Sequence, residues 1–113
     1  MSKPISILGI FVADLTFRTD RMPRQGETVI GNSFKLGPGG KGSNQAVAAR
    51  RAGAEIMFIT KIGKDTFGEI AMKLYADEGI NSEFIWEIPK IATGAAAITV
   101  SYTHLTLPTS DLV

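Results

Sequence analysis

The apolar residues of the chain follow two different spacings, and these predict its elements. Nearly continuous apolar runs predict buried strands, because a strand covered on both faces, as in a parallel sheet, has no polar side. Two such runs, Ile5–Val12 and Glu55–Ile62, predict core strands, and Gly9 inside the first implies a close approach by another backbone or a ligand. The shorter segments Glu83–Ile88 and Ala95–Val100 also predict strands. Two further segments favour helices. Small residues dominate Ser43–Ala52, and a second helix begins at a cap on Asp65 or Thr66 and ends at Gly79.

A more polar segment lies between the first apolar run and the first helix. Leu15–Thr19 and Thr28–Leu36 alternate roughly between apolar and polar residues, and the polar turn Asp20–Gly26 separates them. We expect two short antiparallel strands that turn one face to solvent, a ligand or a partner. The two later alternations of strand and helix predict an α/β fold with a parallel sheet, to which this hairpin is an insertion resembling a lid.

Composition narrows the class of protein. The 113 residues amount to one domain or part of one, with a net charge of +1. This charge gives no broad basic surface for nucleic acid, and no apolar run reaches the roughly 18 residues of a membrane span. The absence of cysteine excludes disulfides and thiolate metal sites and favours a cytoplasmic protein, and His104 as a lone histidine cannot anchor a histidine metal cluster.

Glycines concentrate in Gly37–Gly42, directly before the first helix. Backbone N–H groups and a helix N-terminus together form a cradle for anions or hydroxyls. A phosphate loop of the Walker type is excluded because Lys41 is followed by Gly42 rather than by Ser or Thr. The spacing of three glycines does match a dinucleotide-binding pattern. This stays the less favoured alternative, since the glycines do not follow the first strand and the next strand ends without an acidic residue.

A ligand with several hydroxyl groups fits this loop better. Asp14 follows the first predicted core strand, and open α/β sheets bind ligands at the carboxyl ends of their strands. Lys41 and Asn44 lie at the start of the helix. A carboxylate, an amide and exposed N–H groups suit the adjacent hydroxyls of a sugar, because each hydroxyl both donates and accepts.

Five short segments stand in order along the chain: Val12-Ala13-Asp14, Gly26-Glu27-Thr28, Gly39 to Ala49, Gly63-x-Asp65 and Thr93-Gly94. In order and spacing they resemble motifs of the ribokinase family, the PfkB group of ATP-dependent sugar kinases, and the resemblance covers about residues 4 to 99. It implies the N-terminal part of a ribokinase-like parallel-sheet sandwich with a small β lid. It also implies that the sugar is bound by these residues: Asp14, Gly40, Lys41, Gly42, Ser43 and Asn44.

The resemblance further implies an activity for the full-length enzyme. It would phosphorylate D-ribose to ribose 5-phosphate with ATP and Mg²⁺, with a monovalent cation as a further cofactor, and would form a homodimer through its lid strands. Val12 stands where the family often has Asn, so a related pentose or nucleoside kinase stays open, as does a non-catalytic sugar-binding module. The family's catalytic aspartate lies in a Gly-Ala-Gly-Asp motif that this chain lacks. We therefore assign no catalytic or metal-binding residue here and expect no turnover from these 113 residues alone.

The last residues differ in character from the rest. Val100 to Thr109 matches the translated end of a transposon-type sequencing adapter and contains no charged residue. We expect residues 1–99 to be the N-terminal portion of a ribokinase-like domain, with lid strands at about 15–36 and 91–100, and residues 100–113 to be a non-native tail.

Overall fold

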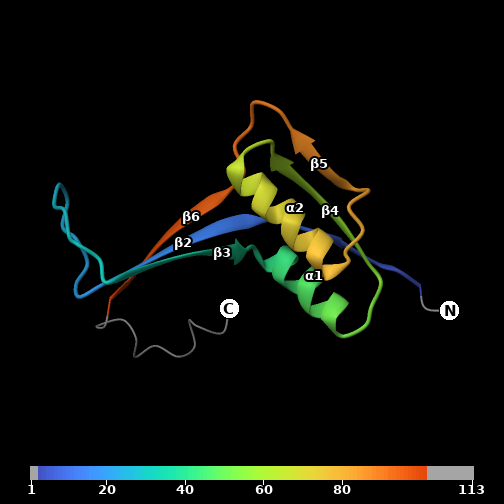
Figure 1. Ribbon diagram of the computed structural model, residues 1–113, viewed down its shortest axis with the longest axis horizontal. Coiled ribbons are helices and arrows are strands. Elements are labelled where there is room, and N and C mark those ends of the chain that lie inside the picture. The colour runs from blue at the N-terminus through green and yellow to red at the C-terminus, as the bar shows by residue number, and fades with distance from the viewer. Residues whose placement is uncertain (1–2, 102–113) are drawn as a thin grey trace. The chain divides into compact units, whose positions relative to one another are not determined.

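The computed structural model describes residues 3–101, and its elements follow the predicted order of strands and helices (Figure 1). The chain divides into two compact units. The first holds the described residues up to Ala13 together with Gly37–Ala96, and the second holds Asp14–Leu36 and the described residues from Ala97 on. Most of the tail, His104 included, lies outside the described residues. None of the described helices is both long enough and apolar enough to cross a membrane.

The first unit is built on a parallel sheet with the strand order β1-β4-β5. The strands are β1 (Ile5–Leu8), β4 (Ile56–Gly63) and β5 (Ile85–Ile88). In the register of the sheet, Ile5 lies opposite Ile56 and Thr60 lies opposite Ile85. Helices α1 (Lys41–Arg51) and α2 (Thr66–Glu78) contact the central strand β4 and each other, as Figure 1 shows. The predicted α/β class with a parallel sheet is thus confirmed.

Tyr75 of α2 lies at the centre of the core of this unit. It is fully buried, and its ring makes edge contacts with Phe58 of β4 at 5.3 Å and with Phe11 at 6.3 Å between centroids. Aromatic pairs prefer such edge-to-face arrangements. The phenol also reaches α1, where its oxygen lies 2.7 Å from Oγ of Ser43. One side chain therefore links both helices to the sheet.

The ends of α2 follow local rules. Asp65 is its N-cap, with a side-chain oxygen that accepts a hydrogen bond of 2.8 Å from the N–H of Gly68. Of the two caps expected, the structure has Asp65, and Thr66 is the first helical residue. Gly79 ends the helix in the left-handed conformation, with φ of 73°, as its position predicted.

A second sheet has the strand order β3-β2-β6. Its strands are β2 (Val12–Thr19), β3 (Ser33–Gly39) and β6 (Ala95–Ser101). Two of the predicted strands have clearly different bounds in the structure. The strand expected over Ile5–Val12 ends at Leu8, and Val12 already belongs to β2. The strand expected over Thr28–Leu36 starts later and continues through Pro38, which is possible because β3 is an edge strand and needs no N–H donor on its outer side.

The burial of β1 also differs from the prediction. We expected a strand covered on both faces, but Ile5 is 47% and Leu8 80% exposed. Within the described residues β1 has a neighbouring strand, β4, on one side only. Its apolar sequence is typical of a central strand, whereas its position here is that of an edge strand.

Candidate functional site

The glycine segment is not a long loop in the structure. β3 continues to Gly39 and α1 begins at Lys41, so Gly40 alone separates the two elements. Gly40 has φ of 96°, and a side chain there would overlap the carbonyl oxygen of Ile10. A glycine is therefore required at this position for the backbone to pack, whether or not a ligand also approaches it.

A second close contact, between two glycines, joins the segment after β1 to helix α1. A Cβ on Gly42 would lie 2.9 Å from Cα of Gly9, and a Cβ on Gly9 would lie equally close to Gly42. The close approach predicted at Gly9 is confirmed, and its partner is the backbone of α1. Gly37, in contrast, has open space around it. Packing of the fold thus accounts for part of the glycine cluster.

The N-terminus of α1 is available to a ligand. No side chain caps its first turn, and that turn contains no acidic residue. The first N–H groups of a helix have no partner within it, and the helix dipole favours negative or electron-rich groups there. Lys41 and Asn44 are both exposed at this end. The turn can therefore donate hydrogen bonds from its backbone and from two side chains.

Ser43 contributes to this turn differently from its neighbours. Its side chain is fully buried and shares a hydrogen bond with the phenol of Tyr75. The hydroxyl is occupied inside the core and no part of Ser43 is exposed, so a contact of its backbone N–H with a ligand stays a prediction.

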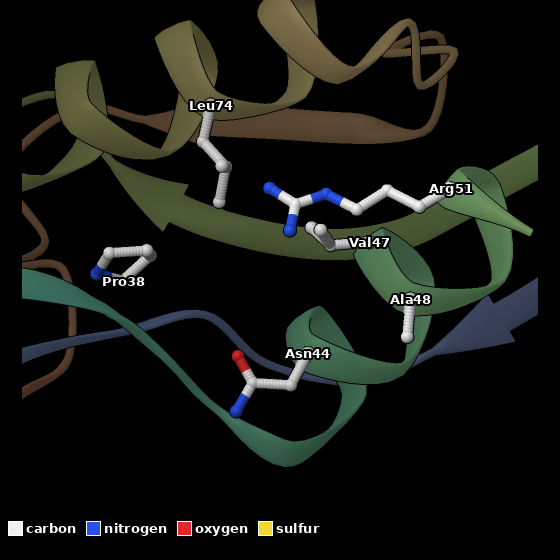
Figure 2. Close-up of a pocket in the computed structure, with 6 residues that line it drawn as sticks. All are labelled: Pro38, Asn44, Val47, Ala48, Arg51 and Leu74. Carbon is white, nitrogen blue, oxygen red and sulfur yellow. The ribbon is translucent and has the colours of Figure 1, made fainter.

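Asn44 lines a cavity of about 280 Å³ beside α1. Figure 2 shows its amide at the first turn, with Leu74 of α2 and Arg51 of α1 farther along the wall. The complete lining consists of six residues: Pro38, Asn44, Val47, Ala48, Arg51 and Leu74. The guanidinium of Arg51 donates to both carboxylate oxygens of Glu78, at 2.7 and 2.9 Å, so its charge is already balanced. The amide of Asn44 is the polar group left to recognise a ligand there.

Asp14 lies elsewhere in the fold than the sequence suggested. We expected it just after a core strand, but that strand, β1, ends at Leu8 and Asp14 is the third residue of β2. Asp14 is half-buried and belongs to the second unit, while Gly40 to Asn44 belong to the first. That Asp14 and the start of α1 bind the same ligand stays a prediction.

Comparison with known proteins places the chain in a family. Residues 2–108 match the family described as pfkB family carbohydrate kinase. The chain belongs to the PfkB family. Similar curated proteins include a ribokinase of Lactococcus lactis, 42% identical over 85% of this chain, and a deoxyribokinase of Salmonella typhi, 37% identical over 86% of it. The chain covers 32% of the length of each.

A solved structure agrees with this membership. The Arabidopsis thaliana ribokinase complexed with ribose and ATP superposes with a TM-score of 0.82 at 25% identity. The match covers 89% of this chain and 33% of that one. This PfkB chain thus spans about a third of the length of the proteins it resembles.

One cluster of hydrogen-bonded polar groups in this PfkB chain was not expected from the sequence. Asp65 binds not only the N-terminus of α2 but also Thr93, which is 28 residues later. Hydrogen bonds from the hydroxyl and N–H of Thr93, and from the N–H of Gly68, hold the pKa of the Asp65 carboxyl below its usual range. Both residues stand in the motifs Gly63-x-Asp65 and Thr93-Gly94, which were the available signal.

Proposed function

We propose that the full-length protein transfers the terminal phosphoryl group of ATP to the primary hydroxyl of D-ribose, giving ribose 5-phosphate. Membership of the PfkB carbohydrate kinase family supports a sugar as the acceptor. Similarity to proteins named ribokinase, one of them crystallised with ribose and ATP, supports ribose and a nucleotide as the two substrates.

The uncapped first turn of α1 is the observation that carries the proposal. Its N–H groups, the ammonium of Lys41 and the amide of Asn44 offer donors at one end of one helix. Sugar hydroxyls can accept these bonds, while the Asp14 carboxylate would accept hydrogen bonds from a neighbouring pair of hydroxyls. Gly40 and Gly42 keep side chains away from this turn. Ser43 would take part through its N–H alone.

A second pentose has specific support. Val12, half-buried at the start of β2, offers no polar group where the family often has Asn. A site that lacks one hydrogen-bonding group rejects a missing hydroxyl less strongly than a fully polar site does. Since a deoxyribokinase is among the similar proteins, 2-deoxyribose is the alternative acceptor. Comparing kcat/KM for ribose and 2-deoxyribose in the wild type and in Val12→Asn decides between them.

The residues of this chain would position the sugar, and they would not carry out the phosphoryl-transfer step themselves. Phosphoryl transfer depends mainly on aligning the acceptor and stabilising charge, and Mg²⁺ supplies part of that charge when bound. Among residues 3–101 there is no group of three or more acidic or histidine side chains that could hold a metal. In the proposed full-length enzyme, which we take to be cytoplasmic, the ligands of Mg²⁺ and of a monovalent cation, the nucleotide site and the catalytic aspartate would lie outside these 113 residues.

The sheet β3-β2-β6 is proposed as a lid and as the surface of a homodimer. It exposes apolar side chains, and the rings of Phe17 and Phe34 pack at 5.0 Å with 40% and 55% of their surfaces exposed. Leu36 is 40% exposed on the same strand as Phe34. Removing such apolar side chains from water is favourable, and a second copy of the chain would bury the same surface on both copies.

Asp14→Ala in the full-length protein tests the sugar site. Loss of a charged partner to two hydroxyls should weaken pentose binding by about 2 kcal/mol, roughly thirty-fold, and leave ATP binding unchanged. Affinities measured separately by calorimetry, with ADP release as the activity readout, check this. Asp20→Ala is the matched control, because Asp20 lies in the turn after β2 and its carboxylate accepts from Asn32. Unchanged pentose affinity, or equal loss for pentose and ATP, contradicts the assignment.

A further inference from the structure

Asp65 uses its two carboxylate oxygens for different purposes. A helix cap needs one acceptor, and Oδ1 supplies it to the N–H of Gly68 at 2.8 Å. Oδ2 accepts a bond of 2.8 Å from the backbone N–H of Thr93, and Oδ1 also lies 2.6 Å from the Thr93 hydroxyl. The second oxygen is thus committed to a segment distant in sequence, which the cap itself does not require.

Thr93 is held from the other side by the end of β4. The N–H of Gly63 donates to the Thr93 hydroxyl at 2.9 Å, and Thr93 is only 7% exposed. The backbone around Thr93 is packed so closely that neighbouring glycines cannot be replaced. A Cβ on Gly63 would overlap the carbonyl oxygen of Ile91, and one on Gly68 would overlap the carbonyl oxygen of Gly63. The segment before β6 is therefore fixed to the parallel sheet and to α2.

The fixed segment in turn holds the start of β2. The carbonyl oxygen of Gly94, the residue after Thr93, accepts a hydrogen bond of 2.9 Å from the N–H of Ala13. Ala13 is fully buried and is followed directly by Asp14. A continuous series of contacts therefore runs from Asp65 through Thr93 and Gly94 to the backbone that carries Asp14.

We propose that Asp65 and Thr93 are positioning residues that fix the backbone from which Asp14 projects. This inference rests on the proposed function, in which Asp14 binds the sugar. The ends of the two segments cross from the first unit into the second, at Asp14 and at Ala97. The bond network lies in the first unit and fixes the backbone of Ala13, to which Asp14 is joined directly. Loss of this network should therefore weaken sugar binding more than it weakens nucleotide binding.

Thr93→Val in the full-length protein tests the proposal, with Thr93→Ser as its rescue. Valine keeps the shape and removes the hydroxyl, whereas serine retains it. We expect the KM for the pentose to rise about ten-fold in Thr93→Val, with the KM for ATP within about two-fold of wild type, because small misplacements of binding groups are costly. Thr93→Ser should return the pentose KM to near the wild-type value.

A matched control separates positioning from stability. Gly79→Ala disturbs the left-handed C-terminus of α2, at the opposite end from Asp65, and lowers the melting temperature without touching Thr93. It should leave the pentose KM unchanged. If Gly79→Ala raises the pentose KM as much as Thr93→Val does, or if Thr93→Val leaves that KM unchanged, the positioning role is overturned.

Asp65→Asn gives a second, milder variant should the valine variant fail to fold. The asparagine oxygen can still cap α2, but its NH₂ group faces the N–H of Thr93, donor against donor. Amide hydrogen exchange at Ala13 reads the network without any substrate. We expect faster exchange at Ala13 in Asp65→Asn and unchanged exchange in the middle of β4. A wild-type protein that phosphorylates no pentose defeats the proposed function, whereas unchanged exchange at Ala13 defeats the network.

Discussion

Adjacent polar side chains of α1 lie in different surroundings, one in the core and one at an exposed cavity, and sequence position alone does not show which is which. Ser43 and Asn44 are adjacent at the start of α1, yet Ser43 is buried against Tyr75 and Asn44 is exposed at a cavity. Because successive helical residues point about 100° apart, neighbours in a binding motif can serve opposite purposes. The two residues should therefore respond differently to substitution.

Ser43→Ala should destabilise the fold without changing pentose affinity. It leaves the buried phenol of Tyr75 without a partner, at a cost of about 1–2 kcal/mol. Urea unfolding measures the change, and Tyr75→Phe provides the other single variant. The double variant should be more stable than the sum of the two single losses predicts, since both halves of the bond are then gone. A strictly additive pair, or a loss of pentose binding in Ser43→Ala, contradicts this account.

Tyr75 should also make stability depend on alkaline pH. Burial raises its pKa to about 12 in the folded protein, from 10.0 for the free group, and the bond with Ser43 opposes this in part. Between these two values the unfolded chain loses the phenol proton first. The free energy of unfolding is thus unaffected below pH 10 and falls as pH rises toward 12. Unfolding midpoints at pH 8 to 11.5 check this, and Tyr75→Phe should remove that part of the slope.

At the scale of elements, backbone contact between glycines sets how closely α1 approaches β1. The Gly9–Gly42 contact leaves no space for a methyl group on either residue. The sequence marked Gly9 as a place of close approach but did not show that a glycine of the loop was its partner. The same loop glycines that suggest a ligand cradle are thus needed for packing.

Gly42→Ala should destabilise the first unit by about 1–3 kcal/mol through overpacking, although alanine is the better helix former. Gly37→Ala is the matched control, because a Cβ there meets nothing within 4 Å. Thermal unfolding of the two variants beside wild type makes the comparison. Equal melting temperatures for Gly42→Ala and Gly37→Ala would show that the helix can shift away from β1 at no cost.

At the scale of the whole molecule, β1 has the sequence of a covered strand and the exposure of an edge strand. Leu8 is 80% and Ile10 63% exposed, although both belong to the apolar run after Pro4. Unpaired strand edges with apolar side chains favour association between chains. The proteins that this chain resembles are about three times as long, and a protein of that length has further chain with which to cover such a strand.

The 113-residue chain should accordingly self-associate as its concentration rises. Leu8→Lys should shift it toward the monomer by placing a charge on the open strand. Ile30→Lys is the control, because Ile30 is equally exposed, at 85%, but lies outside the strands. Sedimentation velocity over a concentration series measures the effect. A wild-type chain that stays monomeric, or an equal effect of both variants, would mean that the edge of β1 is not the contact.

The sequence alone determined the order of elements, the α/β class and the family, because these depend on local spacing and on contiguous motifs. Apolar runs predicted the strands β4 and β5, and the cap residues Asp65 and Gly79 predicted the two ends of α2 to within one residue. Tertiary structure decided what depends on residues far apart. It separated β1 from β2 at Gly9, where the backbone meets α1. It turned the Ser43 hydroxyl into the core, and it joined Asp65 to Thr93. No local pattern specifies such contacts, since each becomes favourable only when the sheet has already brought the distant partner within hydrogen-bonding or van der Waals distance.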